Sequence, residues 1–267
     1  MRLVILCIFV MSMSPLFAEE TIKNSEIQFG AIFFTGPVAD SVYANLYKMP
    51  LLGGLDLGYT YRTHTAEHNI SLRGGAGRIF SPYGTTYSDT PPVSDLAFQL
   101  NIQYASVFQV WNTSTSSFML GPGIHLSANA WIPDSPSINI LRYTWLLHSG
   151  IGVRLRFHWN IDTLHALTAQ IYTPMLNIGW RPTYSVYTLR EETLLETQGF
   201  ATVLFDSPVF LSLHNFVSMD IRFAYRYSVT SLLALKVEYY GVLEYITIPR
   251  SRLELQNNVV FDLVFSF

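Results

Sequence analysis

Apolar and polar residues alternate with a period of two over stretches that are unusually long for β-strands. From Leu96 to Val110 the even positions are mostly aliphatic or aromatic, and the odd positions carry amides and small residues. Successive side chains of a strand point to opposite faces, so this pattern predicts a strand with one apolar and one amide-rich face. At about 16 residues it is much longer than the usual five or six. Such a length suits a tilted strand that crosses a bilayer and extends beyond it, because crossing takes about 9–11 residues.

The same alternation recurs along most of the chain. Near Pro174 it changes phase, which predicts a β-bulge. No convincing amphipathic helix of useful length appears. The further segments with strand character are 27–35, 51–63, 68–80, 117–131, 142–158, 164–180, 198–206, 208–216, 219–229, 232–247 and 258–267.

The connections between these segments alternate in length. Transmembrane barrels have short periplasmic turns and longer outer loops, and Trp residues gather at their two membrane interfaces. In one consistent topology, Trp111 and Trp159 lie at periplasmic strand ends, whereas Trp131 and Trp180 lie at outer ends. Long connections cover about 36–50, 81–93 and 181–197, a shorter one covers 132–138, and tight turns fall at 64–67, 112–116 and 160–163.

These features predict an all-β fold, an antiparallel transmembrane β-barrel of about 12 strands. Twelve strands result if 206–208 is a periplasmic turn and the segments 208–216 and 217–229 are separate strands. Counts of ten or eight are also compatible with the pattern, because the 198–230 region is the least regular. A soluble β-sandwich is the structural alternative, but its strands would be shorter and its outer faces richer in Lys, Glu and Thr.

The N-terminus has the organisation of a secretory signal. Arg2 precedes an apolar run over 3–11, and small residues with a proline lead to Ala18. We expect a signal peptide over 1–18 and one barrel domain over 19–267. The apolar run is too short to cross a membrane, since a spanning helix needs about 20 residues.

Composition excludes several classes of function. Charged residues make up only 13% of the chain, against about 25% in ordinary soluble domains. Cys7 is the only cysteine and lies in the expected signal, so the exported chain would have no disulfide, thiol nucleophile or thiolate metal site. No run of Lys or Arg is present, so nucleic acid is not an expected partner.

The last nine residues, VVFDLVFSF over 259–267, form an amphipathic segment that ends in Phe. This ending resembles the C-terminal signature of bacterial outer-membrane β-barrel proteins. The resemblance implies a location in the bacterial outer membrane, contact with its lipid, and recognition of Phe267 by the barrel-assembly machinery. At the level of architecture the chain is similar to porin-like and OmpW-type barrels and to narrow twelve-stranded channels, without a motif that selects one family.

The polar strand faces carry many charges, which are expected to line the lumen. One interpretation is a charged constriction in a passive channel for small polar or anionic solutes. The alternative is a non-conducting structural or adhesin-like barrel filled by salt-bridged side chains, since about eight strands leave little free space. The main candidate lumen residues are Arg142, His148, Arg154, Arg156, Asp220, Arg222 and Arg226, and further lumen charges are Asp56, Asp95, Lys236, Glu238 and Asp262.

Enzymatic function is the least favoured interpretation, although a lipid-modifying barrel enzyme must be considered. His148 and Ser149 are neighbours in a strand and point to opposite faces, so they cannot form a nucleophile and base pair. His125 and His148 are both expected to face the lumen, with no carboxylate or Ser clearly placed beside them. We therefore expect no catalytic residue, no metal site and no cofactor. The sequence does not indicate an oligomeric state.

Overall fold

The computed structural model describes residues 24–40, 47–80, 95–133, 144–180, 197, 208–247 and 251–267, so the expected signal over 1–18 lies outside the described residues. Almost all of the described chain is β-strand. The strands are β1 (Asn24–Thr35), β2 (Val38–Asp40), β3 (Tyr47–Arg62), β4 (Ala66–Phe80), β5 (Asp95–Asn112), β6 (Ser116–Pro133), β7 (Thr144–Asn160), β8 (His165–Trp180), β9 (Val209–Ser212), β10 (Phe216–Ser228), β11 (Leu233–Ile246) and β12 (Arg252–Ser266).

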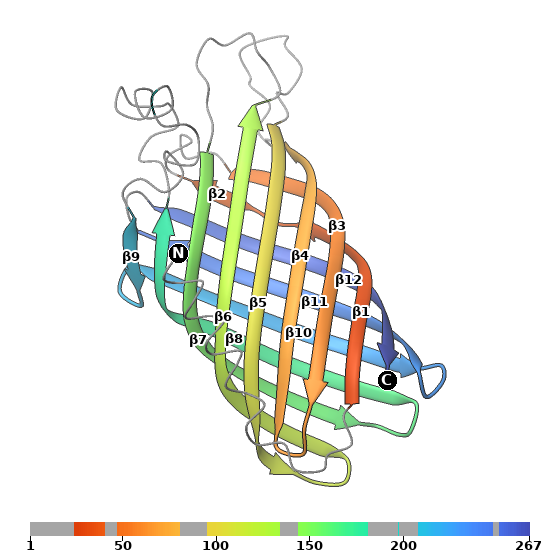
Figure 1. The fold of residues 1–267 in the computed structure, drawn as a ribbon. Helices are drawn as coiled ribbons and strands as arrows, with labels where there is room; N and C mark the ends of the chain where they lie inside the picture. Colours follow the sequence, from red (N-terminus) through yellow and green to blue (C-terminus); the bar gives the residue numbers. More distant parts are fainter. Residues whose placement is uncertain are drawn as a thin grey trace.

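Ten of these strands form a closed antiparallel ring (Figure 1). The ring runs β1, β3, β4, β5, β6, β7, β8, β10, β11 and β12, and it closes because β12 pairs with β1, with Glu26 opposite Ser266. Closure leaves no strand of the ring with an unpaired edge, which an isolated sheet in a bilayer could not avoid. The prediction of an all-β antiparallel barrel is confirmed.

The short strand β2 continues β1 in the same position of the ring. Thr35 lies opposite Leu51 of β3, and three residues later Val38 lies opposite Lys48, so the register is unbroken. Between them Gly36 has a φ of 144°, and a Cβ there would lie 1.9 Å from the Leu255 carbonyl oxygen. Glycine is therefore required at the kink that separates the two strands.

The count of 12 spanning strands is wrong, whereas the alternative count of ten agrees with the ring, and the region 208–216 explains the error. Only four of its residues form β9, which pairs with the end of β8 but is not one of the ten strands of the ring, and a strand of this length is too short to cross a bilayer. The chain turns directly afterwards: the Asn215 amide donates to the Ser212 carbonyl (2.9 Å), and the Ser212 amide donates to Asn215 Oδ1 (2.7 Å). The other segment involved in that count, 198–206, lies outside the described residues.

Four tight turns lie at one end of the barrel, where the C-terminus also lies (Figure 1), and we call this the short-turn end. Each turn is closed by a side-chain oxygen that accepts from backbone amides, a common way for Thr and Asp to build turns. In the β7–β8 turn the Leu164 and His165 amides donate to Asp162 Oδ1 and lower the pKa of this carboxyl group. The other three turns use Thr63, Thr113 and Thr230.

The opposite end is called the long-loop end, because the segments that join the strands there are mostly longer. The difference between the two ends agrees with the alternation predicted from sequence. The predicted bulge near Pro174 is also confirmed: Ile151 pairs with Leu176 and Gly152 pairs with Pro174, so Met175 has no partner on β7. This extra residue produces the change of phase along β8.

The outer surface of the ring is apolar. The side chains of Phe29, Phe223 and Phe261 are 50%, 55% and 51% exposed, and similar residues follow each other around the barrel. Trp111 and Trp159 are also exposed, near the short-turn end. A continuous apolar surface of this size is unfavourable in water, whereas it is favourable in contact with the lipid of a membrane. Among the described residues no helix is long and apolar enough to cross a membrane.

Candidate functional site

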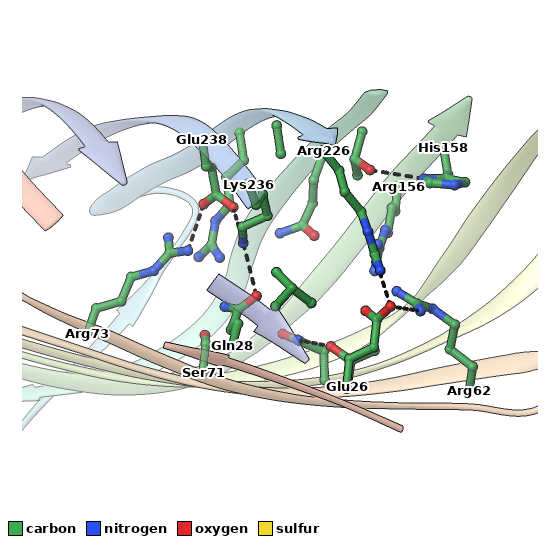
Figure 2. Close-up of a pocket in the computed structure, with 17 residues that line it drawn as sticks. Glu26, Gln28, Arg62, Ser71, Arg73, Arg156, His158, Arg226, Lys236 and Glu238 are labelled. Carbon is green, nitrogen blue, oxygen red and sulfur yellow. Dashed lines mark hydrogen bonds and ion pairs between the residues drawn. The ribbon is translucent and has the colours of Figure 1, made fainter. Parts of the chain in front are cut away.

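The lumen is filled by charged side chains that interact across the barrel. Arg73 of β4 is the central one, and its Nε lies 2.8 Å from Asp56 Oδ1. Its Nη2 lies 2.6 Å from Glu238 Oε1, a contact shown in Figure 2. Asp56 is the cross-strand neighbour of Arg73, whereas Glu238 comes from β11 on another part of the wall. The side chains of Arg73, Asp56 and Glu238 are 1%, 0% and 7% exposed, so this triad is buried.

Lys236 extends the same layer to the seam of the barrel. Its Nζ lies 3.1 Å from Glu238 Oε2 and 2.8 Å from Asp262 Oδ2, and it donates to Gln28 Oε1 at 3.0 Å. The five strands β1, β3, β4, β11 and β12 are therefore connected through their inward-facing side chains. Burial of this many charges is tolerable only because each is paired with an opposite charge.

A second layer lies between the central triad and the long-loop end. Gln103 Oε1 accepts hydrogen bonds from Arg154 Nη2 (2.8 Å) and Arg222 Nη2 (2.5 Å), and its Nε2 donates to Asp220 Oδ2 (2.8 Å). The Tyr240 hydroxyl donates to the same Asp220 oxygen at 3.1 Å. One glutamine therefore joins β5, β7 and β10 across the lumen.

A third layer lies nearer the short-turn end and is more accessible. Glu26 Oε1 is 2.8 Å from Arg62 Nη1 and 2.5 Å from Arg226 Nη1 (Figure 2). Glu67 forms ion pairs with Arg62 and with Arg156. Arg62 and Arg226 are about a quarter exposed, unlike Arg73. Two carboxylates thus hold three arginines around the opening of the lumen.

Two histidines form a separate cluster towards the long-loop end. His125 Nε2 lies 2.9 Å from His148 Nδ1, and His125 Nδ1 lies 3.0 Å from the Tyr172 hydroxyl. His148 Nε2 is 3.1 Å from Glu244 Oε2. The sequence interpretation missed Glu244 as the carboxylate beside these histidines, although it has the same phase along β11 as Lys236 and Glu238.

Apolar side chains fill the lumen further towards the long-loop end. One cluster lies against the histidines, and the His148 and Phe216 rings are 5.3 Å apart. The second cluster lies on the wall formed by β1, β2, β3, β4, β5 and β12. The buried members of the first cluster are Leu146, Leu211, Phe216 and Ile246, and those of the second are Ile32, Phe34, Val38, Leu52, Ile79, Ala97 and Val260.

The space left between these side chains narrows along the barrel. A cavity of about 280 Å³ lies at the short-turn end, and a cavity of about 90 Å³ lies next to it around the third layer. Towards the long-loop end, cavities lined by the histidine cluster and by Gln256 measure only about 20 and 10 Å³. Since one water needs roughly 10–15 Å³, the described part of the lumen is closed to solutes in this conformation.

The structure places six of the seven main candidate residues on the lumen side, whereas Arg142 lies outside the described residues. Arg154, Asp220 and Arg222 meet at Gln103, Arg156 and Arg226 belong to the third layer, and His148 belongs to the histidine cluster. Gln103 and Arg73 were not selected from sequence as central residues. Within the described ranges, no three His, Cys, Asp or Glu side chains are grouped so that they could hold a metal ion.

A closed antiparallel barrel with an apolar belt and a polar, charged interior defines an integral outer-membrane β-barrel protein. No protein-family model and no curated protein sequence matches the chain. Solved structures do: the outer membrane protease OmpT of Escherichia coli has 8% sequence identity and a TM-score of 0.55, with 94% of this chain and 99% of that chain covered.

Two further similar structures are membrane channels or outer-membrane proteins by their descriptions. The toluene transporter TodX of Pseudomonas putida has 9% identity and a TM-score of 0.35, with 94% of this chain and 91% of that chain covered. The outer membrane protein OprG of Pseudomonas aeruginosa has 8% identity and a TM-score of 0.36, with 93% and 97% covered. These two scores are too low to support an argument, so the likeness to OmpT confirms the fold alone. Together with the apolar belt, it agrees with the expected location in the bacterial outer membrane.

Proposed function

We propose that this protein is a closed outer-membrane barrel that acts through its surface, as a membrane-anchored interaction scaffold, and not through a permanently open pore. This is the structural or adhesin-like alternative considered from the sequence. The single observation that carries it is the filled lumen, in which ion-paired layers are followed by apolar clusters. In such a protein the segments at the long-loop end provide the contacts with partners, because binding residues concentrate in loops held by a rigid scaffold.

The ion pairs support closure because of how they are linked. Each layer joins strands from different parts of the wall, as Gln103 does for β5, β7 and β10. Opening a path for solutes would require separating several buried charges at once, and a buried charge without its partner is strongly unfavourable. Thermal motion of single side chains therefore does not open this lumen.

Swelling of proteoliposomes tests the proposal. Vesicles with the wild-type protein should swell in isotonic solutions of small sugars and amino acids no faster than vesicles without protein. Vesicles that contain a general porin are the control for detection of an open lumen. Swelling of wild-type vesicles clearly above the rate of protein-free vesicles would refute the proposal.

A passive channel for small anionic solutes is the second candidate, and the basic opening at the short-turn end favours it. In this case Arg154 and Arg156 would line the conducting path. Replacing both by Glu should then shift the reversal potential towards cations, because rings of charge set ion selectivity. The shift should shrink in concentrated salt, since the Debye length falls to about 3 Å at 1 M.

Catalysis remains the least supported function. The histidine cluster brings a base and a carboxylate together, but within the described residues the nearby Ser149 hydroxyl donates to the His125 backbone carbonyl (2.9 Å) and not to an imidazole. The side chains of His148 and Ser149 leave opposite faces of β7, as expected. A hydrolase of the serine type would need this hydroxyl beside the base.

A further inference from the structure

The wall of the cavity of about 90 Å³ beside the third layer contains more basic than acidic side chains, and Asp56, Glu67 and Asp262 pair with three of these bases from outside the wall. The wall itself contains two acidic side chains, Glu26 and Glu238, and six basic ones. The acidic side chains are already engaged in ion pairs with Arg and Lys. The basic residues are Arg62, Arg73, Arg156, Arg222, Arg226 and Lys236, and Figure 2 shows most of them around a common central space.

Several residues of this wall carry hydrogen-bonding atoms that have no partner among the described residues. Arg73 Nη1 and Ser71 Oγ are the most enclosed of them, in side chains that are 1% and 2% exposed. Gln170 Nε2 and the Nε atoms of Arg156 and Arg222 are also unpartnered. All of these atoms can donate a hydrogen bond, and no unpartnered carboxylate oxygen belongs to a residue of this wall. Buried donors without partners are costly, so they indicate a missing acceptor.

We propose that this cavity is a binding site for a small water-soluble oxyanion, such as phosphate or a short carboxylate. Ser71 and Gln170 would supply neutral donors from β4 and β8, and Arg73, Arg156 and Arg222 would supply charged donors. Hydrogen bonds from guanidinium groups to phosphate or carboxylate are about twice as strong as neutral ones, and arginine suits such anions geometrically.

The ligand enters from the short-turn end. The cavity of about 280 Å³ at that end shares Arg62, Arg156, His158 and Arg226 with the smaller cavity. Towards the long-loop end the central triad and the second layer close the path. The site is therefore a blind pocket that is filled from one aqueous compartment, and a lipid headgroup with its acyl chains does not fit inside the ring. This inference holds whether or not the barrel acts as a surface scaffold.

Titration of inorganic phosphate into the full-length protein tests the site. Isothermal titration calorimetry in a detergent free of phospholipid should detect saturable binding by the wild-type protein, and acetate should compete. Gln170→Glu keeps the shape of the side chain but replaces a donor by a negative charge. Since like charges brought together in a binding site are strongly repulsive, the affinity for phosphate should fall by about tenfold or more. Ser71→Ala should weaken binding by a smaller factor.

Asn177→Asp is the matched control. Asn177 is a buried lumen amide of the same strand as Gln170, but it is not part of this cavity. Its replacement should leave the affinity for phosphate within about twofold, because the added charge lies outside the site. Heat-modified migration on gels confirms folding of every variant. Absence of phosphate binding to the wild-type protein, unchanged binding by Gln170→Glu, or an equal loss in Gln170→Glu and Asn177→Asp would each overturn the proposal.

Discussion

Arg73 and Glu238 are 165 residues apart in the chain, and their side chains meet inside the barrel with 2.6 Å between Nη2 and Oε1. The contact joins β4 to β11 without any backbone pairing between these strands. It also gives Arg73 its second carboxylate partner, after Asp56 on the neighbouring strand. The closed lumen depends on pairs of this kind.

Arg73→Met should strongly destabilise the barrel. It leaves Asp56 and part of the charge of Glu238 buried without compensation, and loss of one partner of a buried pair costs about 3–5 kcal/mol. Arg62→Met is the control, because Arg62 is 29% exposed and its partners Glu26 and Glu67 keep other arginines. Its cost should be about 0–1 kcal/mol. Urea titrations in lipid vesicles measure both, and equal losses would contradict the special role of the central triad.

A charge on the outer surface should be penalised according to its depth in the membrane. Phe261 lies on the lipid face of β12, six residues from the terminal Phe267 at the short-turn end. Phe261→Arg should cost about 2–4 kcal/mol, the value expected near the bilayer midplane. Leu232→Arg, in the exposed turn between β10 and β11, should cost about 0–1 kcal/mol, as expected at an interface. The same vesicle titration measures the stability of both variants. Equal losses of stability would show that the exposed apolar residues of the strands are not deeper in the membrane than those of the turn.

Phe267 combines two roles that can be separated by substitution. Its backbone closes the seam of the barrel, since the Phe267 amide donates to the Ser25 carbonyl and the Ser25 amide donates to the Phe267 carbonyl, both at 2.9 Å. Deletion of Phe267 removes these bonds and the ring, whereas Phe267→Ala removes only the ring. If the aromatic ring is the assembly signal, both variants should reduce the amount of surface-exposed protein in cells. If the Phe267→Ala variant inserts normally, the effect of the deletion must result from the loss of the backbone hydrogen bonds between Phe267 and Ser25, and not from the loss of the ring.

Gly30 should not tolerate a side chain. A Cβ at this position would lie 2.1 Å from Asp262 Oδ1 and 2.2 Å from the Phe261 carbonyl oxygen. Gly30→Ala must therefore displace Asp262 from Lys236, and overpacking of this kind costs about 1–3 kcal/mol. Gly53→Ala is the control, because a Cβ at Gly53 has no atom within 4 Å. A cost for Gly53→Ala as large as that for Gly30→Ala would mean that loss of strand flexibility, and not the clash, is responsible.

The sequence predicts strands and their faces well because these depend on local alternation. Leu100 and Asn101 were assigned to the outside and the inside of one strand, and their exposed fractions of 39% and 9% agree with that. The bulge at Met175 was also predictable, since one extra residue reverses the phase of everything that follows.

The number of strands was harder to predict, because a segment with the alternation of a strand can be too short to span the membrane. Phe210 is exposed and Leu211 is buried, so β9 begins with the alternation of a spanning strand, but Leu213 is exposed although it would share a face with Leu211 in a longer strand. What ends β9 is the turn built by Asn215, and this turn depends on hydrogen bonds to Phe210 and Ser212 that alternation does not reveal. A turn signal inside an alternating segment was therefore interpreted as part of a longer strand.

The partners inside the lumen could not be predicted from alternation. Phase predicts that Arg154, Asp220 and Arg222 point inwards, but their meeting at Gln103 depends on the tilt of the strands and the stagger of their registers around the ring. Glu244 was missed for the same reason. Its contact with His148 joins β7 and β11, which lie apart in the strand order.

The conductance of single protein molecules in a planar lipid bilayer is the most direct test of a closed lumen. Recordings in about 1 M KCl are suitable, because screening then reduces the influence of the lumen charges on ion entry. The wild-type protein should insert without producing steady, linear conductance steps, while a general porin in the same bilayer should produce them. Reproducible, steady conductance steps of the wild-type protein would contradict a closed barrel.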